Sequence, residues 1–215
     1  MLTSPFMKVW SDSFEDGGWI PEANALGKRD ASNRAELSAN RNPHLAWSDL
    51  PDGTKSLAIV MYDVSVPSKP DDVNQEGRVV SPDLPRVEFD HWALINVSPD
   101  APIEAGTHSD GVTPGGKTPA HAPEGTSHGV NDYTGWFAGD EGMRGDYYGY
   151  DGPGPPWNDG LVHEYVLTVY ALDTEDVGVE GAYKRADVMR AIEGHVLGQA
   201  SLRGKYTINP DAVER

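Results

Sequence analysis

The chain has 215 residues, a formal net charge of −17 and no cysteine. This length suits one well-packed domain over residues 1–215 and leaves little room for a second core. The acidic charge disfavours binding to nucleic acid or to anionic membranes, which are themselves polyanions. The lack of cysteine excludes disulfides, thiol nucleophiles and cysteine-ligated metal sites.

Abundant turn-forming residues and short apolar runs predict a mainly β fold. The 24 glycines and 17 prolines leave few stretches for long helices. Three runs rich in β-branched and aromatic residues, 57–62 (LAIVMY), 92–97 (WALINV) and 165–172 (YVLTVYAL), are typical of buried central strands. Residues 8–13 and 200–207 are weaker strand candidates, and the second alternates as a half-buried strand does. Together they predict a sheet of five or more strands.

One segment near the C-terminus predicts a helix. In residues 186–197 (ADVMRAIEGHVL), the apolar residues Val188, Ile192 and Val196 recur every four positions and would form a buried stripe. Gly198 follows at the position of a left-handed helix cap.

Polar residues with useful chemistry lie at the ends of the predicted central strands. Asp63 ends the first strand, His91 begins the second, and His163 stands two residues before the third. Two long connections, 63–90 and 98–150, join these strands, and loops of such length are usually functional or mobile. Because strand ends at one rim can gather polar groups around a concave site, we expect these three side chains to converge.

Four segments carry a resemblance to a known family: NPHLAWSDLPDGTKSLAIVMYD (42–63), DHWALINV (90–97), YGYDGPGPPWNDGLVHEYVLTVYALD (148–173) and RADVMRAIEGHVLGQASLRGKY (185–206). In order and character they resemble the phosphatidylethanolamine-binding protein family, specifically its prokaryotic Raf-kinase-inhibitor-like branch. The resemblance covers residues 40–206. Its most specific part is the Gly-Pro-Pro loop followed by His and Tyr on a strand.

This resemblance implies a β-sandwich-like fold with a large central antiparallel sheet, a smaller sheet, long loops and a few peripheral helices, including one near the C-terminus. It also implies a small pocket for phosphate or for phosphorylated headgroups such as phosphoethanolamine. The residues carried over to the pocket are Asp63, His91, Pro156, His163 and Tyr165. No metal and no organic cofactor is implied.

Two departures from the family pattern touch this pocket. The usual Asp-Pro-Asp-Ala-Pro turn stands here as DVSVP (63–67), so Ser65 replaces a second acid. The usual His-Arg-Tyr stands as HEY, with Glu164 in place of the arginine. Alternation along the strand predicts that Glu164 points away from the face shared by its two neighbours.

Two further features of the long connections concern their aromatic residues and their histidines. The aromatic insertion 133–148 contains Trp136, Phe137, Tyr147 and Tyr148, which suit a lid over the pocket, a contact with a second subunit, or packing within the loop itself. The second feature is a set of widely spaced histidines that matches no metal-binding pattern, so we expect solvated loop side chains. They are His108, His121 and His128.

The favoured functional hypothesis is non-catalytic binding of a phosphate-bearing or other anionic small ligand, with a role in regulating a partner protein. One alternative is a metal-dependent or acid–base hydrolytic enzyme using Asp63, His91 and His163. No Gly-x-Ser-x-Gly motif supports a serine hydrolase. Another alternative is a protein-interaction module with a vestigial pocket.

The expected cellular setting follows from the same sequence. The chain shows no secretion signal and no apolar run long enough to insert into a membrane, so we expect a cytoplasmic protein. A homodimer is compatible with a compact domain that carries long surface loops.

Overall fold

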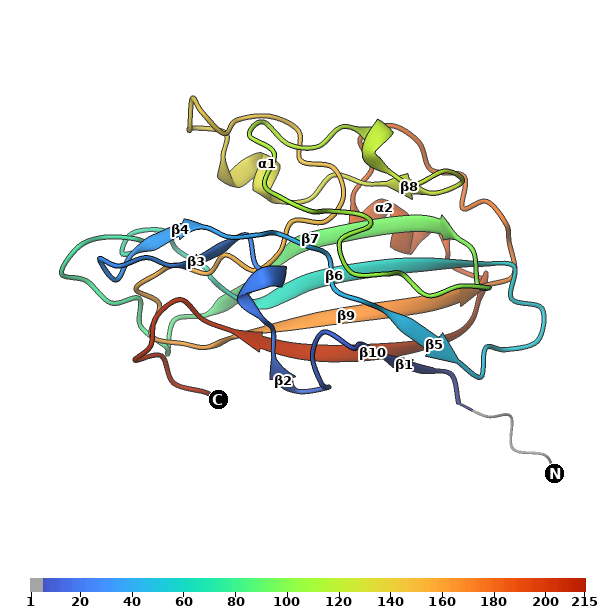
Figure 1. Cartoon of the computed structure of the whole chain (residues 1–215), viewed down its shortest axis with the longest axis horizontal. Coiled ribbons are helices and arrows are strands. Elements are labelled where there is room, and N and C mark those ends of the chain that lie inside the picture. Colours follow the sequence, from blue (N-terminus) through green and yellow to red (C-terminus); the bar gives the residue numbers. More distant parts are fainter. Residues whose placement is uncertain (1–5) are drawn as a thin grey trace.

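A six-stranded sheet dominates the protein, whose computed structural model describes residues 6–215 (Figure 1). The strand order is β2-β10-β9-β6-β7-β8, and all neighbours are antiparallel except β2 and β10, which run parallel. The predicted mainly β fold is confirmed. The strands of this sheet are β2 (Gly18–Trp19), β6 (Ser56–Pro67), β7 (Arg86–Val97), β8 (Ser127–His128), β9 (His163–Leu172) and β10 (Val196–Tyr206).

Two small sheets and a few short helices complete the fold (Figure 1). Strand β1 (Lys8–Trp10) pairs with β5 (Ala46–Ser48), and β3 (Gly27–Arg29) forms a hairpin with β4 (Ala35–Leu37). The helical elements are η1 (Glu22–Asn24), η2 (Pro119–His121), α1 (Tyr133–Trp136) and α2 (Arg185–Ala191). None of the helices within residues 6–215 is long and apolar enough to span a membrane.

Alternating side chains of the central strand β6 contribute to a separate core on each face of the sheet. Leu57, Ile59 and Met61 are fully buried in the main core, which the N-terminal segments and the long connections cover. Ala58 belongs to a second core on the opposite face, where helix α2 packs against β7 through residues such as Val188. The three predicted central strands are therefore confirmed, although the observed strands are longer.

The predicted helix begins where expected but ends earlier. Helix α2 stops at Ala191, and the chain turns at Gly194, whose φ of 84° lies in the left-handed region that favours glycine. Strand β10 already begins at Val196, so the prediction of a helix through residue 197 with a cap at Gly198 is wrong. The apolar spacing of four continues by chance into the strand, where Val196 is 40% exposed instead of buried.

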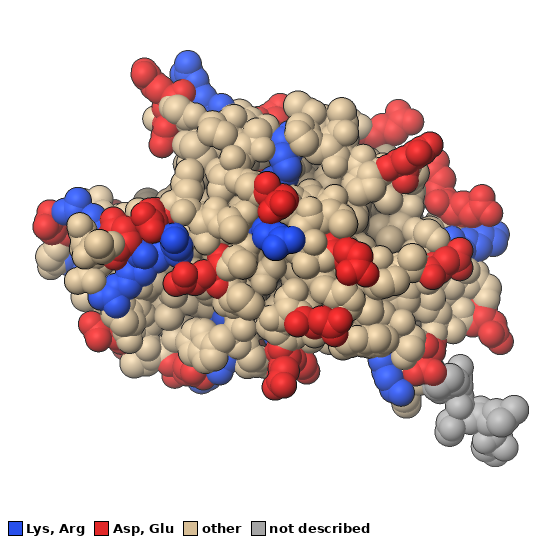
Figure 2. Space-filling model, in the orientation of Figure 1, with Lys and Arg blue, Asp and Glu red and all other residues tan. Residues whose placement is uncertain are grey.

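Acidic side chains lie scattered across the face of the molecule shown in Figure 2. The chain has 34 Asp and Glu residues against 17 Lys and Arg residues. Because like charges repel over roughly a Debye length, an anionic ligand gains nothing at long range from this surface. Contacts of short range must then account for any anion binding.

Candidate functional site

The strand register brings the predicted polar residues to one end of the large sheet. Asp63 on β6 pairs with Phe89 on β7 and with Tyr165 on β9. His91 lies two residues beyond Phe89, and His163 two residues before Tyr165, so the two imidazoles flank the level of the carboxylate from opposite directions along the strands. The three residues are separated by long stretches of sequence, and only the pairing of β6 with both neighbours unites them.

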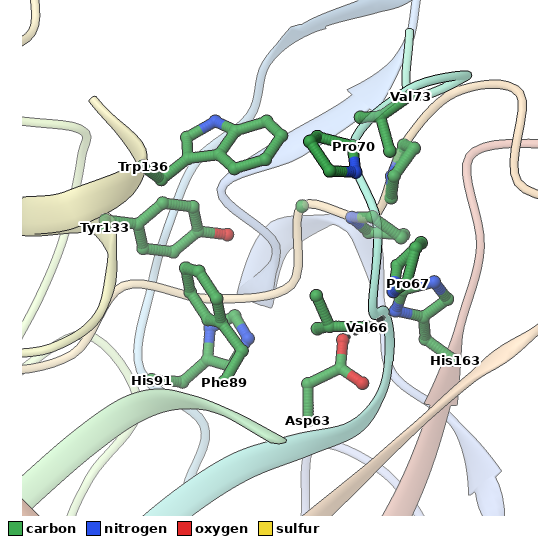
Figure 3. Close-up of a pocket in the computed structure, with 13 residues that line it drawn as sticks. Asp63, Val66, Pro67, Pro70, Val73, Phe89, His91, Tyr133, Trp136 and His163 are labelled. Carbon is green, nitrogen blue, oxygen red and sulfur yellow. Dashed lines mark hydrogen bonds and ion pairs between the residues drawn. The ribbon is translucent and has the colours of Figure 1, made fainter. Parts of the chain in front are cut away.

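A cavity of about 240 Å³ opens above these residues (Figure 3). Asp63, His91 and His163 form its polar floor. Aromatic side chains make one wall, and valine and proline side chains make the other, as Figure 3 shows. The remaining lining residues are Val66, Pro67, Pro70, Val73, Phe89, Tyr133, Trp136, Gly154, Pro155 and Pro156.

His163 is held between two carboxylates. Its Nδ1 lies 2.6 Å from Asp63 Oδ2, and its Nε2 lies 2.9 Å from Asp159 Oδ2. Burial alone would lower the pKa of His163, but the two carboxylates outweigh burial and raise it to about 9. The ring is therefore an imidazolium at neutral pH, and both of its N–H groups donate to protein oxygens.

Arg86 completes this buried charge network. Its guanidinium binds Asp159 through two contacts, Nη1–Oδ2 at 2.6 Å and Nη2–Oδ1 at 3.0 Å. Burial raises the pKa of Asp159, but hydrogen bonds from His163 and Arg86 outweigh it and lower the pKa overall. Two cations and two carboxylates, counting Asp63, leave the cluster formally neutral.

His91 offers the free ring nitrogen of the floor. Its Nδ1 lies 2.7 Å from the carbonyl oxygen of Asp151, which can only accept, so Nδ1 carries the proton. Burial lowers the pKa of His91 despite the nearby carboxylates Asp63, Asp151 and Asp90. The ring is therefore neutral at pH 7, and its Nε2 presents a lone pair that no residue in the described chain contacts by a hydrogen bond.

The residue behind His91, Asp151, is a buried hydrogen-bond hub. Its carboxylate accepts from Lys117 Nζ, Asn40 Nδ2 and Asn131 Nδ2, each at 2.8 Å. The Asp151 N–H also donates to the carbonyl oxygen of His91 at 3.2 Å. This hub fixes the start of the DGPGPP loop against β7 and holds the His91 ring in one orientation.

The glycines of the DGPGPP loop are required by close packing. A methyl group on Gly152 would overlap the carbonyl oxygen of Asn24, and one on Gly154 would lie 2.6 Å from the hydroxyl of Tyr133. The Gly152 N–H donates to Asn40 Oδ1 at 2.8 Å, whereas the Gly154 N–H has no hydrogen-bond partner among residues 6–215. The loop thus brings one free backbone donor to the cavity wall.

The five residues predicted for the site occupy two layers. Asp63, His91, Pro156 and His163 line the cavity. Tyr165 lies beneath the floor, 1% exposed, with its ring centroid 5.3 Å from that of His91 and 6.5 Å from that of His163. The Tyr165 hydroxyl has no hydrogen-bond partner among the described residues. The structure therefore places Tyr165 as a support for both imidazoles and not in the cavity lining.

Ser65 and Glu164, two residues that depart from the family pattern, have defined contacts in the structure. The Ser65 N–H donates to Asp63 Oδ1 at 2.6 Å, so the residue at the position of the missing acid still orients the carboxylate. A second carboxylate reaches His163 from Asp159 instead. Glu164 points away from the cavity, as predicted, and pairs with Arg203 on β10.

The aromatic insertion 133–148 forms a wall of the cavity. Tyr133 and Trp136 line it. Phe137 stacks on Tyr133 at a centroid distance of 5.5 Å and lies 5.2 Å from the Tyr147 ring behind it. The insertion therefore both packs within itself and shapes the pocket.

Two of the three loop histidines are not solvated, contrary to expectation. His108 and His128 are buried beside Trp92, with their ring centroids 5.7 Å apart, and only His121 is exposed. Burial lowers the pKa of His108 to about 4 and that of His128 to about 3. Their burial depends on the path of a long connection, which sequence patterns do not encode.

Comparison with known proteins relates this fold and site to one family. The family model described as phosphatidylethanolamine-binding protein matches residues 10–207. A UPF0098 protein of Methanothermobacter thermautotrophicus is 30% identical over 200 residues, which cover 93% of this chain and 98% of the relative. The Escherichia coli UPF0098 protein YbhB is 26% identical over 201 residues, covering 94% and 100% of the two chains.

Solved structures agree in fold. The crystal structure of Escherichia coli YbcL, described as a new member of the mammalian PEBP family, superposes with a TM-score of 0.65 at 22% identity, covering 95% of this chain and 100% of the other. A putative PEBP homologue from Chlamydia trachomatis gives a TM-score of 0.63 at 23% identity, covering 94% and 97%. From the match across nearly the whole length, the chain belongs to the phosphatidylethanolamine-binding protein family.

Proposed function

We propose that the cavity is a binding site for a small phosphorylated ligand and that the protein acts by binding and not by catalysis. The observation that carries this proposal is the pair of unused polar groups at the cavity, His91 Nε2 and the Gly154 N–H. Both belong to rigid parts of the site, because the Asp151 hub fixes the ring and prolines follow the glycine. A preformed site loses little conformational entropy when a ligand binds.

The size and lining of the cavity suit a headgroup better than a large molecule. Its volume of about 240 Å³ lies below the roughly 300–1,000 Å³ that is typical of sites for drug-sized ligands. The aromatic wall made by Phe89, Tyr133 and Trp136 can pack against the carbon atoms of a ligand or face an ammonium group. Asp63 retains lone pairs that can accept from such an ammonium.

The charge of the protein favours a zwitterionic ligand over a polyanion. The net charge of −17 repels highly charged anions from the surface. O-phosphoethanolamine carries an ammonium group that offsets part of its phosphate charge. The family description also names phosphatidylethanolamine, of which O-phosphoethanolamine is the headgroup.

The geometry gives less support to the hydrolytic alternative. The cavity lining contains no serine, threonine, cysteine or lysine that would serve as a nucleophile. His163 could bind a metal or move a proton only by breaking a bond to Asp63 or to Asp159. Within residues 6–215, no group of three or more His, Cys, Asp or Glu side chains is arranged to hold a metal ion.

Imidazole NMR tests the proposal directly. Titration of the ¹⁵N-labelled protein with O-phosphoethanolamine at pH 6 should shift the His91 Nε2 resonance, while the His121 resonances stay fixed. His91→Ala should weaken binding at least tenfold, whereas His121→Ala, at an exposed position, should leave binding unchanged. An unshifted His91 signal at saturating ligand would refute the binding function.

A further inference from the structure

The floor of the cavity contains hydrogen-bond acceptors but no free charged donor. Both N–H groups of His163 donate to carboxylates. The Arg86 guanidinium is occupied by Asp159 and by backbone carbonyl oxygens of residues 65, 81 and 84. Lys117 is buried and donates to Asp151. None of these three cationic side chains is therefore available at the cavity to bind an anionic oxygen.

The groups that remain at the cavity floor and on the DGPGPP loop are two acceptors and one neutral donor. Asp63 is a carboxylate, and His91 Nε2 is a lone pair because Nδ1 holds the ring proton. The Tyr133 hydroxyl is not available, since it donates to the carbonyl oxygen of Gly152 at 2.8 Å. Among the described residues that line the cavity, the Gly154 N–H on the loop and the indole N–H of Trp136 on the aromatic wall can donate without a change in protonation.

An anion that enters such a site must bring a proton with it. We infer that the pocket selects phosphate monoesters over phosphate diesters, because only a monoester can supply a proton to the contact with His91 Nε2. This inference rests on the proposed function and names the class of ligand. A monoester has a second ionisation near pH 6, so its monoanion retains one P–OH group. That hydroxyl donates to Nε2, and the other phosphate oxygens accept from the Gly154 N–H.

A diester cannot form the same contact. It is a monoanion whose free oxygens carry no proton, so its oxygens would face the Nε2 lone pair and the Asp63 carboxylate as acceptor against acceptor. Binding it would require His91 to take a proton from solvent at the cost that burial imposes. A monoester dianion with a protonated His91 contains the same number of protons as a monoanion with neutral His91, so either description gives one shared proton.

The surroundings of His91 are consistent with one shared proton. Asp63 faces the ring from β6, Asp90 adjoins it on β7, and Asp151 contacts it from the loop. The rings of Tyr133 and Tyr165 pack against it from α1 and β9 at centroid distances of 5.5 and 5.3 Å. These carboxylates favour a proton on the contact, and the tyrosines contribute no positive charge.

Matched ligand pairs test this inference by calorimetry on the full-length protein. Methyl phosphate is compared with dimethyl phosphate, and O-phosphoethanolamine with glycerophosphoethanolamine, which is its diester counterpart. At pH 6 each monoester should bind at least tenfold more tightly than its diester. Between pH 7 and 8.5 the monoester affinity should fall about tenfold per pH unit, because one proton is taken up on binding.

The number of protons taken up on binding and the His91→Gln variant test the role of the shared proton. Titrations of methyl phosphate at pH 8 in two buffers of different ionisation enthalpy should give close to one proton taken up per ligand. In His91→Gln the side-chain amide donates at every pH, so the preference for monoesters and the pH slope should both disappear. Equal binding of monoester and diester by the wild type, without proton uptake, would overturn the inference and leave the proposed function standing. Failure of all four ligands to bind would overturn the proposed function itself.

Discussion

Asp63 and His163 are one hundred residues apart in sequence, yet Asp63 Oδ2 and His163 Nδ1 lie 2.6 Å apart in the core of the site. The contact forms because β6 and β9 are neighbours in the sheet and Asp63 pairs with Tyr165, which places His163 diagonally across from Asp63 on the same face. It makes His163 a buried cation that orients Asp63 and leaves His91 as the imidazole available to a ligand. The two imidazoles thus differ in charge and hydrogen bonding although both line the same cavity.

The buried ion pair between Arg86 and Asp159 should be important for stability. Asp159→Asn removes the carboxylate that Arg86 and His163 share, leaving the buried Arg86 charge unpaired, since the Arg86 and Asp159 side chains are only 6% and 1% exposed. Breaking a buried pair of this kind costs about 3–5 kcal/mol. Urea unfolding at pH 7 measures the loss, and NMR titration should show the pKa of His163 falling from its value of about 9.

The exposed pair of His195 and Asp173 provides a matched control. Its Nδ1–Oδ1 distance is 2.7 Å, but the two side chains are 49% and 47% exposed. Asp173→Asn should therefore cost less than about 1 kcal/mol. Equal losses of unfolding free energy in Asp159→Asn and Asp173→Asn would contradict the claim that the buried Asp159 network stabilises the fold.

The stability of the protein should decrease in mild acid. His108 and His128 remain neutral in the folded protein down to pKa values of about 4 and about 3, whereas both protonate near pH 6.5 when unfolded. Because the unfolded state binds more protons, the free energy of unfolding falls as the pH drops below 6.5, by up to about 1.4 kcal/mol per pH unit for each histidine.

Unfolding in urea at pH 7, 6 and 5 measures this slope. For each variant, the free energy of unfolding at pH 6 and 5 is compared with that of the same variant at pH 7. In His128→Leu, the decrease with falling pH should be smaller by the contribution of one histidine. His121→Leu, at the exposed end of η2, should leave the slope unchanged. A slope in His128→Leu that matches the wild type would show that His128 titrates normally in the folded state.

Trp136 should contribute to ligand binding but little to stability. It lines the cavity and is 48% exposed at the mouth. Trp136→Ala should weaken O-phosphoethanolamine binding roughly fivefold, equivalent to about 1 kcal/mol of lost packing and cation–π contact. Trp19 is 50% exposed on β2 and does not line the cavity, so Trp19→Ala should bind like the wild type. Similar affinities for the two variants would argue against the aromatic wall.

The glycine spacing of the DGPGPP loop should be sensitive to a single methyl group. Gly152→Ala places a Cβ against the Asn24 carbonyl oxygen, where the neighbouring backbone cannot move easily. We expect a loss of about 2 kcal/mol or more in the free energy of unfolding from overpacking. Gly135→Ala in α1 meets no atom within 4 Å and should be neutral or slightly stabilising. Thermal unfolding compares the two, and a Gly152→Ala protein as stable as Gly135→Ala would contradict the packing described for the loop.

The sequence predicted the central strands and the convergence of Asp63, His91 and His163. Short apolar runs with β-branched residues are local signals, and the ends of neighbouring strands share a rim, so both features follow from local patterns. The end of helix α2 could not be predicted in the same way. Its spacing of apolar residues continues past Gly194, and only the pairing of Val196 with Leu172 shows that a strand has begun.

The contacts that assign roles within the site were beyond sequence reasoning. Arg86 meets Asp159 across 73 positions, and Asp151 meets Lys117 across 34, through loops whose paths no periodicity determines. Because of these pairings, both ring nitrogens of His163 are hydrogen-bonded, whereas only Nδ1 of His91 is. Asp159, four residues before His163, was the nearest available signal, but an Asp-Gly pair there is equally typical of a turn.

A crystal structure of the wild-type protein with O-phosphoethanolamine tests the central claim most directly. The proposal predicts a phosphate group in the cavity with one oxygen within hydrogen-bond distance of His91 Nε2 and another near the Gly154 N–H, while His163 keeps its contacts to Asp63 and Asp159. A cavity that stays empty at saturating ligand, or a phosphate bound through a displaced His163, would contradict it.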